Sequence, residues 1–269
     1  MKIGLQVADF TWPGAPDSIG PPEHEMLEGY AALAYAAGVT KTITLGTLVT
    51  GVTYRHPGLL IKTVTTLDVL SGGRAWLGIG AAWNEDESRS LGFPFPPLGE
   101  RFEMLEETLR MAHGMFDGQR GTEAEFHGRQ FHATRLLNSP QSLSRPRVPI
   151  MVGGGGEKKT LRLVAQYADA CNVFGTPEAI ARKYAILAQH CAAIGRDPDE
   201  IERSTLQDIR ISAGGDGGTG GQTGAQIVDR FGELADAGAQ HVIVSLRDLV
   251  DPSRLDLVGR DVIPHLRSL

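Results

Sequence analysis

The chain has 269 residues, 41% hydrophobic and 22% charged, and can bury the core of one α/β domain over residues 1–269. Its net charge of −6 and pI near 5.8 argue against a nucleic-acid-binding protein and against a basic protein of membrane surfaces. No apolar run reaches the roughly 18 residues that span a bilayer, and we expect no signal peptide before the first predicted strand. The two thiols, Cys171 and Cys191, lack a metal-ligand or Cys-x-x-Cys spacing, which favours a reduced, cytoplasmic protein.

Strand and helix patterns alternate along the chain. Seven apolar or β-branched segments are predicted to be strands: 2–7, 42–49, 75–79, 150–152, 170–174, 205–212 and 241–246. Helical patterns cover 23–37, 57–70, 101–116, 157–167, 177–194 and 225–237, and a closing helix follows. In the first helix, Leu27, Tyr30, Ala31 and Ala34 share one face. Such alternation is typical of parallel strands joined by helical crossovers.

Residues 117–148 interrupt this alternation with Gly, Pro, Ser and His, so we expect an insertion that contains a hairpin. His127 and His132 lie five positions apart on that hairpin. We expect them to alternate faces and to make a poor metal pair, and we predict no metal site.

A (β/α) barrel needs eight strands, and one is missing between residues 7 and 42. The Pro- and Gly-rich stretch 9–22 is too short for the absent helix and strand. Either the barrel is incomplete, or a segment is absent from the sequence near Gly20–Pro21. We favour the absent segment, because an open barrel would expose two unpaired strand edges. The predicted fold is an α/β (β/α)8 barrel.

The stretch Pro149-Ile-Met-Val-Gly-Gly-Gly-Gly-Glu157 places four glycines between a strand and a helix. Glycines allow a close ligand approach, and the free amides of a helix N-terminus attract an anion such as a phosphate. The alternative is a glycine-rich turn without a ligand. Neither the P-loop nor the dinucleotide-binding spacing fits this run.

Several motifs together resemble a known family. They are Gly46-Thr-Leu-Val-Thr-Gly-Val-Thr-Tyr-Arg-His-Pro57, Leu67-Asp-Val-Leu-Ser-Gly-Gly-Arg-Ala-Trp-Leu-Gly-Ile-Gly80, Trp83-Asn-Glu85 and the glycine run itself. This combination resembles the bacterial luciferase-like flavin and deazaflavin oxidoreductases. The segment Cys191-Ala-Ala-Ile-Gly-Arg-Asp-Pro-Asp-Glu-Ile201 is most similar to the branch that uses the deazaflavin coenzyme F420.

The resemblance implies a TIM barrel that holds its cofactor at the C-terminal ends of the strands. It also implies a non-proline cis peptide bond near Leu48-Val49-Thr50. Relatives usually carry an Asp-His pair where this chain passes from Gly20 to Pro21, and no Asp-His dipeptide occurs in this sequence.

We expect the ring of such a cofactor to lie on backbone at the strand ends. Leu48, Val49 and Thr50 would back one face, and ordinary strand packing is the alternative for this segment. Gly80, Ala81 and Ala82 would allow close approach. Asn84 would hydrogen-bond the polar tail, or would cap a helix that begins at Glu85. The predicted phosphate-binding residues are Gly153, Gly154, Gly155 and Gly156.

Other residues are weaker candidates. His56 could act as an acid or base, but it also stands at a helix start. Arg55 could bind an anion or could be a solvated loop residue. Asp68 and Arg74 lie at the opposite, N-terminal strand ends, where stability is the expected role.

Two further features concern the substrate. Sugar-phosphate dehydrogenases of the family carry an acid after the fourth-strand glycine loop, where this chain has Trp83, so a more apolar substrate pocket is expected. The glycine-rich segment 214–224 would form either a lid over the active face or a disordered loop.

The sequence therefore predicts a cytoplasmic F420-dependent oxidoreductase that transfers a hydride between deazaflavin and a small organic substrate. One alternative is an FMN-dependent luciferase-like monooxygenase that uses reduced flavin and O2. A second is a non-catalytic flavin-binding protein. The expected partners are a small-molecule substrate and a second copy in a homodimer, with neither nucleic acid nor membrane.

Overall fold

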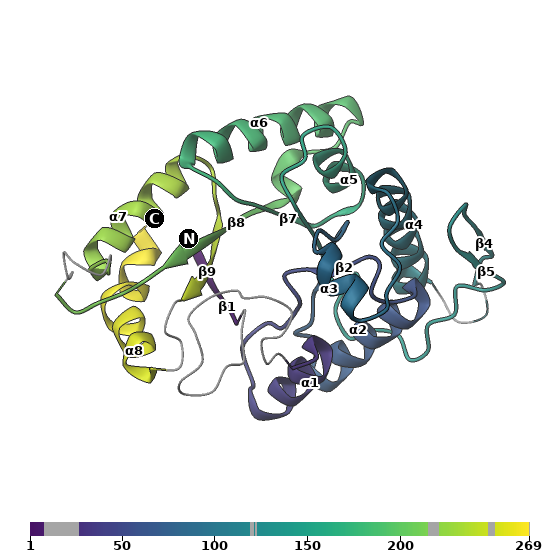
Figure 1. Cartoon of the computed structure of the whole chain (residues 1–269), viewed down its shortest axis with the longest axis horizontal. Helices are drawn as coiled ribbons and strands as arrows, with labels where there is room; N and C mark the ends of the chain where they lie inside the picture. Colours follow the sequence, from purple (N-terminus) through teal and green to yellow (C-terminus); the bar gives the residue numbers. More distant parts are fainter. Residues whose placement is uncertain (8–26, 119–120, 122, 215–220, 247–250, 269) are drawn as a thin grey trace. The chain divides into compact units, whose positions relative to one another are not determined.

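The computed structural model describes residues 1–7, 27–118, 121, 123–214, 221–246 and 251–268, and the chain divides into two compact units (Figure 1). One comprises Met1–Met26 with Cys171–Leu269, and the other comprises Leu27–Ala170. The predicted gap near Gly20–Pro21 and the centre of the glycine-rich segment 214–224 lie outside the described residues. The single domain expected over 1–269 stays a prediction.

The unit Leu27–Ala170 contains three parallel strands in the order β6-β3-β2, in which Thr50 pairs with Ile79 and Leu77 pairs with Ile150. The strands are β2 (Thr50–Gly51), β3 (Leu77–Gly80) and β6 (Ile150–Gly153). The helices are α1 (Gly29–Val39), α2 (Pro57–Ser71), α3 (Glu85–Ser90), α4 (Leu98–Asp117) and α5 (Thr160–Tyr167). The expected hairpin is confirmed within the insertion as β4 (Phe126–His127) and β5 (His132–Ala133).

The second unit contains the strands β1-β9-β8-β7 in that order, with β9 parallel to both β1 and β8. The strands are β1 (Lys2–Gln6), β7 (Ala170–Val173), β8 (Glu202–Ile209) and β9 (His241–Leu246). The helices are α6 (Pro177–Ala193), α7 (Gly224–Asp236) and α8 (Pro252–Asp261), with the 3-10 turns η1 (Pro198–Glu200) and η2 (Ile263–Ser268). Besides the hairpin, the described residues of the two units thus contain seven strands, the number expected from the sequence.

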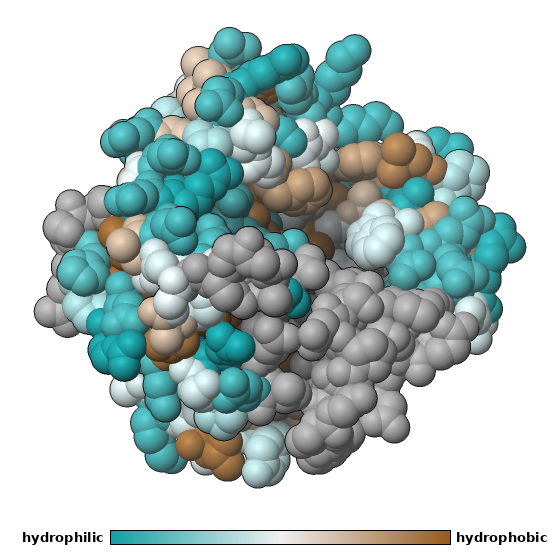
Figure 2. Space-filling view, turned by 60° about the vertical axis from the view of Figure 1, so that its left-hand side comes forward, coloured by the Kyte–Doolittle hydropathy of each residue, from teal (hydrophilic) through white to brown (hydrophobic). Residues whose placement is uncertain are grey.

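Burial follows the apolar patterns of the sequence. Every residue of β3 is buried, as continuous apolar runs are in parallel sheets. In α4, Leu105, Leu109 and Ala112 recur at helical spacing and are completely buried. The face of the molecule in Figure 2 is mostly hydrophilic, with small hydrophobic areas between. No helix among the described residues is both long and apolar enough to cross a membrane. The homodimer and the cytoplasmic location stay predictions.

The expectation of a continuous strand over residues 42–49 is wrong. Only Leu45 forms a bridge, to Ala75, and the regular pairing starts again at Thr50. Between them the Thr47 hydroxyl donates to the carbonyl oxygen of Gly78 at 3.0 Å. The Leu48–Val49 peptide bond is cis, as the family resemblance implied.

Several element boundaries and one helix face also differ from expectation. Helix α1 begins at Gly29, and Leu27, expected on its buried face, is 57% exposed. The buried positions of this helix are Tyr30 and Ala37. Helix α5 begins at Thr160 because three turn residues follow the glycine run, and β8 begins earlier than expected, at Glu202.

Asp68 and Arg74 have structural roles, as their position at the N-terminal strand ends suggested. The completely buried Asp68 carboxylate accepts the amide hydrogens of Leu143 at 2.6 Å and Ser144 at 2.9 Å. The Arg74 guanidinium donates to the carbonyl oxygens of Ala37 and Thr40, both at 3.1 Å. Arg74 therefore satisfies carbonyls at the end of α1 that have no partner within the helix.

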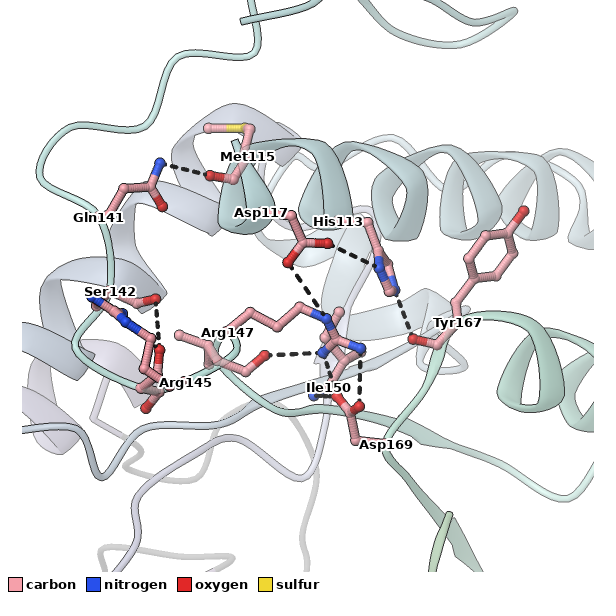
Figure 3. A network of polar contacts seen from close by, with 12 residues as sticks. His113, Met115, Asp117, Gln141, Ser142, Arg145, Arg147, Ile150, Tyr167 and Asp169 are labelled. Atoms are coloured by element: carbon pink, nitrogen blue, oxygen red, sulfur yellow. Dashed lines mark hydrogen bonds and ion pairs between the residues drawn. The ribbon is translucent and has the colours of Figure 1, made fainter. Parts of the chain in front are cut away.

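A second polar network lies at the start of β6 (Figure 3). The Arg147 guanidinium pairs with both carboxylate oxygens of Asp169, at 2.5 and 2.9 Å, and Asp169 accepts the amide hydrogen of Ile150 at 2.7 Å. Asp117, at the end of α4, lies within 3.9 Å of Arg147 and 3.7 Å of His113. The network thus joins the end of α4 to β6 and to the residue before β7.

The β4–β5 hairpin is held to α4 by one carboxylate. Glu107, which is 7% exposed, accepts backbone amide hydrogens from Arg129 at 2.7 Å, Gln130 at 3.0 Å and Phe131 at 2.9 Å. A Cβ on Gly128 would lie 2.2 Å from this carboxylate, so the turn needs glycine there. A single side chain thus satisfies three amides of the hairpin turn.

We predict that Glu107→Ala lowers the free energy of unfolding by about 2–4 kcal/mol, because three amides lose a charged acceptor. The matched control is Glu103→Ala on the same helix, whose carboxylate meets the more exposed side chains of Arg129 and Gln130. We expect the control to cost less than about 1 kcal/mol. Urea unfolding measures both variants, and equal losses would contradict a special role for Glu107.

In the unit that contains β8 and β9, the Glu202 carboxylate accepts a hydrogen bond from His241 Nδ1 at 2.8 Å. It also forms an ion pair with Lys2. The His241 hydrogen bond, assisted by Lys2, lowers the pKa of Glu202 to about 2 from its ordinary 4.5. The ionised carboxylate is therefore favoured in the folded state. Its contribution to stability is complete above pH 4.5 and is lost as the pH falls towards about 2.

We predict that the difference in the free energy of unfolding between the wild type and Glu202→Gln narrows as the pH falls from 4.5 towards 2, measured by urea unfolding at pH 6, 4 and 3. A constant difference would contradict the assignment.

Candidate cofactor site at the strand ends

Val49 brings together the three backbone segments that the sequence suggested for a cofactor. A Cβ built on Gly80 would lie 3.0 Å from Val49 Cγ2, and one built on Gly153 would lie 2.8 Å from Val49 Cγ1. The Val49 side chain therefore occupies the space that side chains at the ends of β3 and β6 would need. Val49, Gly80 and Gly153, one residue from each of the segments 48–50, 80–82 and 153–156, therefore lie together, and binding of a cofactor by these segments stays a prediction.

Three hydroxyl groups fix the segment before β2. The Thr50 hydroxyl lies 2.7 Å from the Tyr30 hydroxyl and 2.8 Å from that of Thr47. Burial raises the pKa of Tyr30, so this phenol keeps its proton at neutral pH. Tyr30 was expected only on a helix face, because nothing in the pattern of α1 indicates what its hydroxyl contacts.

Arg101 holds the loop after β3. Its Nη1 donates to the carbonyl oxygens of Ala81 at 3.0 Å and Ala82 at 2.5 Å, and its guanidinium lies 4.0 Å from the ring centroid of Phe95. Ala82 has a φ of 62°, a left-handed conformation that is uncommon for a residue with a Cβ. Arg101 is 8% exposed, and no local pattern of α4 indicates that its guanidinium holds the loop after β3.

Asn84 caps α3, which was the alternative considered for it. Its Oδ1 accepts the amide hydrogen of Glu87 at 3.1 Å. The Tyr54 hydroxyl donates to the Glu87 carboxylate at 2.7 Å, and the Tyr54 ring stacks on Phe93 with centroids 5.4 Å apart. Burial, followed by the Glu87 hydrogen bond, raises the pKa of Tyr54 to about 12. Contact of Asn84 with a cofactor stays a prediction.

The glycine run forms the turn between β6 and α5. Gly154 has a φ of 123°, which only glycine adopts without strain, and Gly156 lies against the Thr160 hydroxyl. No side chain of the described residues caps the N-terminus of α5, where the N-cap residue is Lys159. Lys158 and Lys159 are exposed beside this turn. The Leu161 amide donates to the carbonyl oxygen of Gly156, and the Lys159 ammonium lies 5.2 Å from the Phe102 ring centroid. The positive end of the helix and the two ammonium groups favour a negatively charged ligand.

His56 and Arg55 are both engaged in local contacts. His56 Nδ1 accepts the amide hydrogen of Gly58 at 3.2 Å and caps α2, so the structural alternative is observed. Arg55 forms an ion pair with Glu28, and its guanidinium lies 4.8 Å from the ring centroid of Tyr30. A catalytic role for His56 stays a prediction.

The expectation that His127 and His132 alternate faces is wrong. The two residues are direct partners across the β4–β5 ladder, because the turn between them places them opposite each other. Their rings lie 6.2 Å apart, and His127 Nε2 is 2.8 Å from the Glu125 carboxylate. Within the part of the chain that the structure describes, no group of three or more His, Cys, Asp or Glu side chains is placed to hold a metal ion.

A family model described as luciferase-like monooxygenase matches residues 15–212. An uncharacterized protein of Mycobacterium tuberculosis is 31% identical over 171 residues, which are 64% of this chain and 58% of that protein. An F420-dependent glucose-6-phosphate dehydrogenase of Nakamurella multipartita is 31% identical over 73% of this chain and 57% of that protein. These matches span little more than half the length of the relatives.

The fold matches solved structures over most of the chain. The coenzyme F420-dependent tetrahydromethanopterin reductase of Methanopyrus kandleri has a TM-score of 0.76. The match covers 89% of this chain and 88% of that protein at 21% sequence identity. This likeness confirms the expected α/β barrel fold.

Val49 and Gly153 should be energetically coupled. We predict that Gly153→Ala lowers the free energy of unfolding by about 1–3 kcal/mol, since its Cβ would overlap Val49 Cγ1. Adding Val49→Ala should recover part of that loss, with a coupling energy above about 0.5 kcal/mol in a double-mutant cycle.

The control for this cycle is Gly99→Ala in α4, where a Cβ would meet nothing within 4 Å. We expect this change to be neutral or stabilising by up to about 1 kcal/mol. If Gly153→Ala behaves like Gly99→Ala in urea unfolding, the close approach described here is wrong.

Proposed function

Since the chain belongs to the luciferase-like monooxygenase family, we propose that it is an F420-dependent oxidoreductase that transfers a hydride between the deazaflavin coenzyme and a small organic substrate. Members of this family use F420 or FMN. The observation that carries the proposal is the convergence of Val49, Gly80 and Gly153 at the ends of three strands. A flat ring needs an apolar surface free of long side chains, and the Val49 methyl groups packed over the two glycines offer one.

The residues of this chain fit a cofactor with an anionic tail. The turn after β6 has four successive glycines, so its amides can be approached closely. The first turn of α5 has no side-chain cap among the described residues, and Lys158 and Lys159 stand beside it. In the proposed complex these groups bind the phosphate of the cofactor.

The surrounding residues orient the ligand. Tyr30 and Thr47 hold the Thr50 hydroxyl, and Arg101 holds the carbonyls of Ala81 and Ala82. Bound deazaflavin supplies the hydride-carrying ring. His56 remains a candidate for proton transfer: because Nδ1 accepts a hydrogen bond from Gly58, the proton of its neutral ring stays on Nε2.

Two alternatives compete with this proposal. An FMN-dependent monooxygenase would use the same turn for the FMN phosphate, since the amides and lysines recognise charge rather than the ring. A non-catalytic flavin-binding protein is the second, because the chain lacks the Asp-His pair expected from the family resemblance. Selective binding of F420 or of FMN distinguishes the proposed oxidoreductase from the FMN-dependent monooxygenase. Catalytic turnover distinguishes both enzymes from the non-catalytic flavin-binding protein.

We predict that the purified chain binds F420 more tightly than FMN when both are titrated and followed by ligand fluorescence. Replacing Lys158 and Lys159 together by alanine should weaken F420 binding by about tenfold, because a phosphate loses two cationic partners. The control is Lys41→Ala, an exposed lysine at the end of α1. Tighter FMN binding would favour the monooxygenase, and no binding of either ligand would contradict both proposals.

A further inference from the structure

Trp83 is an indole that the fold leaves in solvent. It is 81% exposed, the highest value among the large hydrophobic side chains of the described residues. Trp76, by contrast, packs so tightly that a Cβ on Gly46 would lie 2.5 Å from its ring. Burial of a tryptophan side chain is strongly favourable, so an exposed tryptophan on a folded surface indicates a candidate place for ligand binding.

This exposure does not come from a loosely held loop. The carbonyls of Ala81 and Ala82, immediately before Trp83, accept hydrogen bonds from the buried Arg101. Asn84, immediately after it, caps α3. Both neighbours of Trp83 are therefore anchored, and its backbone holds the indole out from the surface.

Trp83 also lies at the right end of the strands. The Cβ of Ala82 would be 3.1 Å from a Cβ on Gly51, the last residue of β2. Gly51 borders the Tyr54 ring as well, 3.6 Å from the same position. The indole thus begins where β2 and β3 end, beside the surface proposed for the cofactor ring.

The charges near Trp83 disfavour anionic substrates. The first turn of α3 consists of Glu85, Asp86 and Glu87, and residues 81–88 contain no lysine or arginine. Arg89 is already paired with Glu85 at 2.6 Å. Glu87 accepts from Tyr54, and the nearby Arg101 is buried and donates to the carbonyls of Ala81 and Ala82. Residues 81–89 keep a net charge of −2, from three acids and Arg89, which disfavours an anionic group beside the indole.

We propose that Trp83 forms one wall of the substrate site and stacks on a flat, apolar group of a neutral or cationic substrate. This inference rests on the proposed oxidoreductase function, which places the reacting ring at the same strand ends. The indole supplies a broad face, and the acidic turn repels phosphate esters and other anions. Trp83 is thereby a specificity-determining residue.

The test uses the full chain labelled with 5-fluorotryptophan, with and without F420. The probes are 2-acetonaphthone, a neutral flat ketone, and glucose 6-phosphate, an anionic sugar. The 19F resonance of Trp83 is assigned by its loss in Trp83→Phe. We expect 2-acetonaphthone to shift this resonance and glucose 6-phosphate to leave it unchanged.

Affinities for 2-acetonaphthone are then compared among variants. Trp83→Ala should weaken binding by about five- to tenfold, and Trp83→Phe should retain most of it, because a smaller ring still stacks. The matched control is Tyr35→Ala, an aromatic residue on α1 that is 75% exposed, which should bind as the wild type does.

Three results would overturn the inference: equal affinity of Trp83→Ala and wild type, a Trp83 shift with glucose 6-phosphate alone, or an equal loss with Tyr35→Ala. The fluorescence of F420 reports cofactor binding separately in the same samples. A Trp83 response to the ketone without F420 binding would support the substrate wall and contradict the proposed cofactor. F420 binding without a Trp83 response to the ketone would support the proposed cofactor and contradict the substrate wall.

Discussion

The close approach of Val49 to the ends of β3 and β6 is the constraint on which the candidate site depends. Its two methyl groups fill the volume where Gly80 and Gly153 would otherwise carry side chains. Three segments that are far apart in the sequence thereby share one small apolar contact. Stiff, β-branched valine suits this place because its rotamer is restricted and its position is therefore well defined. The loops that follow β3 and β6 therefore begin from well-defined positions, at Gly80 and Gly153.

Helix α4 connects that site to the rest of its unit. Near its start, Arg101 holds the loop after β3, and further along, Glu107 holds the hairpin turn. At its end, Asp117 joins the network around Arg147 and Asp169 (Figure 3). The long insertion is thus attached by carboxylates to the helix before it and, through Asp68, to α2. A region without regular secondary structure can be well fixed when buried charges satisfy its amides.

The sequence predicted most of the elements because their patterns are local. Continuous apolar runs predicted β3, β6 and β9, and helical spacing predicted α2, α4 and α7. The prediction of a strand over 42–49 failed because only Leu45 pairs, with Ala75, and a local apolar pattern does not show which of its residues meet a neighbouring strand. The pairing of His127 with His132 depends on the turn register. Tyr30 and Arg101 were missed as supports of the site because their roles depend on residues 20 positions away.

The glycines at 80 and 153 have a consequence for comparing this chain with its relatives. Packing against Val49 is sufficient to require them, so they would persist in a descendant that had lost its ligand and changed its chemistry. Shared glycine at these two positions therefore records common ancestry and not common activity. Gly154 is required likewise by its φ of 123°, and Gly156 by its closeness to the Thr160 hydroxyl. The exposed Trp83 is under no such packing requirement, so inheritance of function along this lineage should be traced through that position.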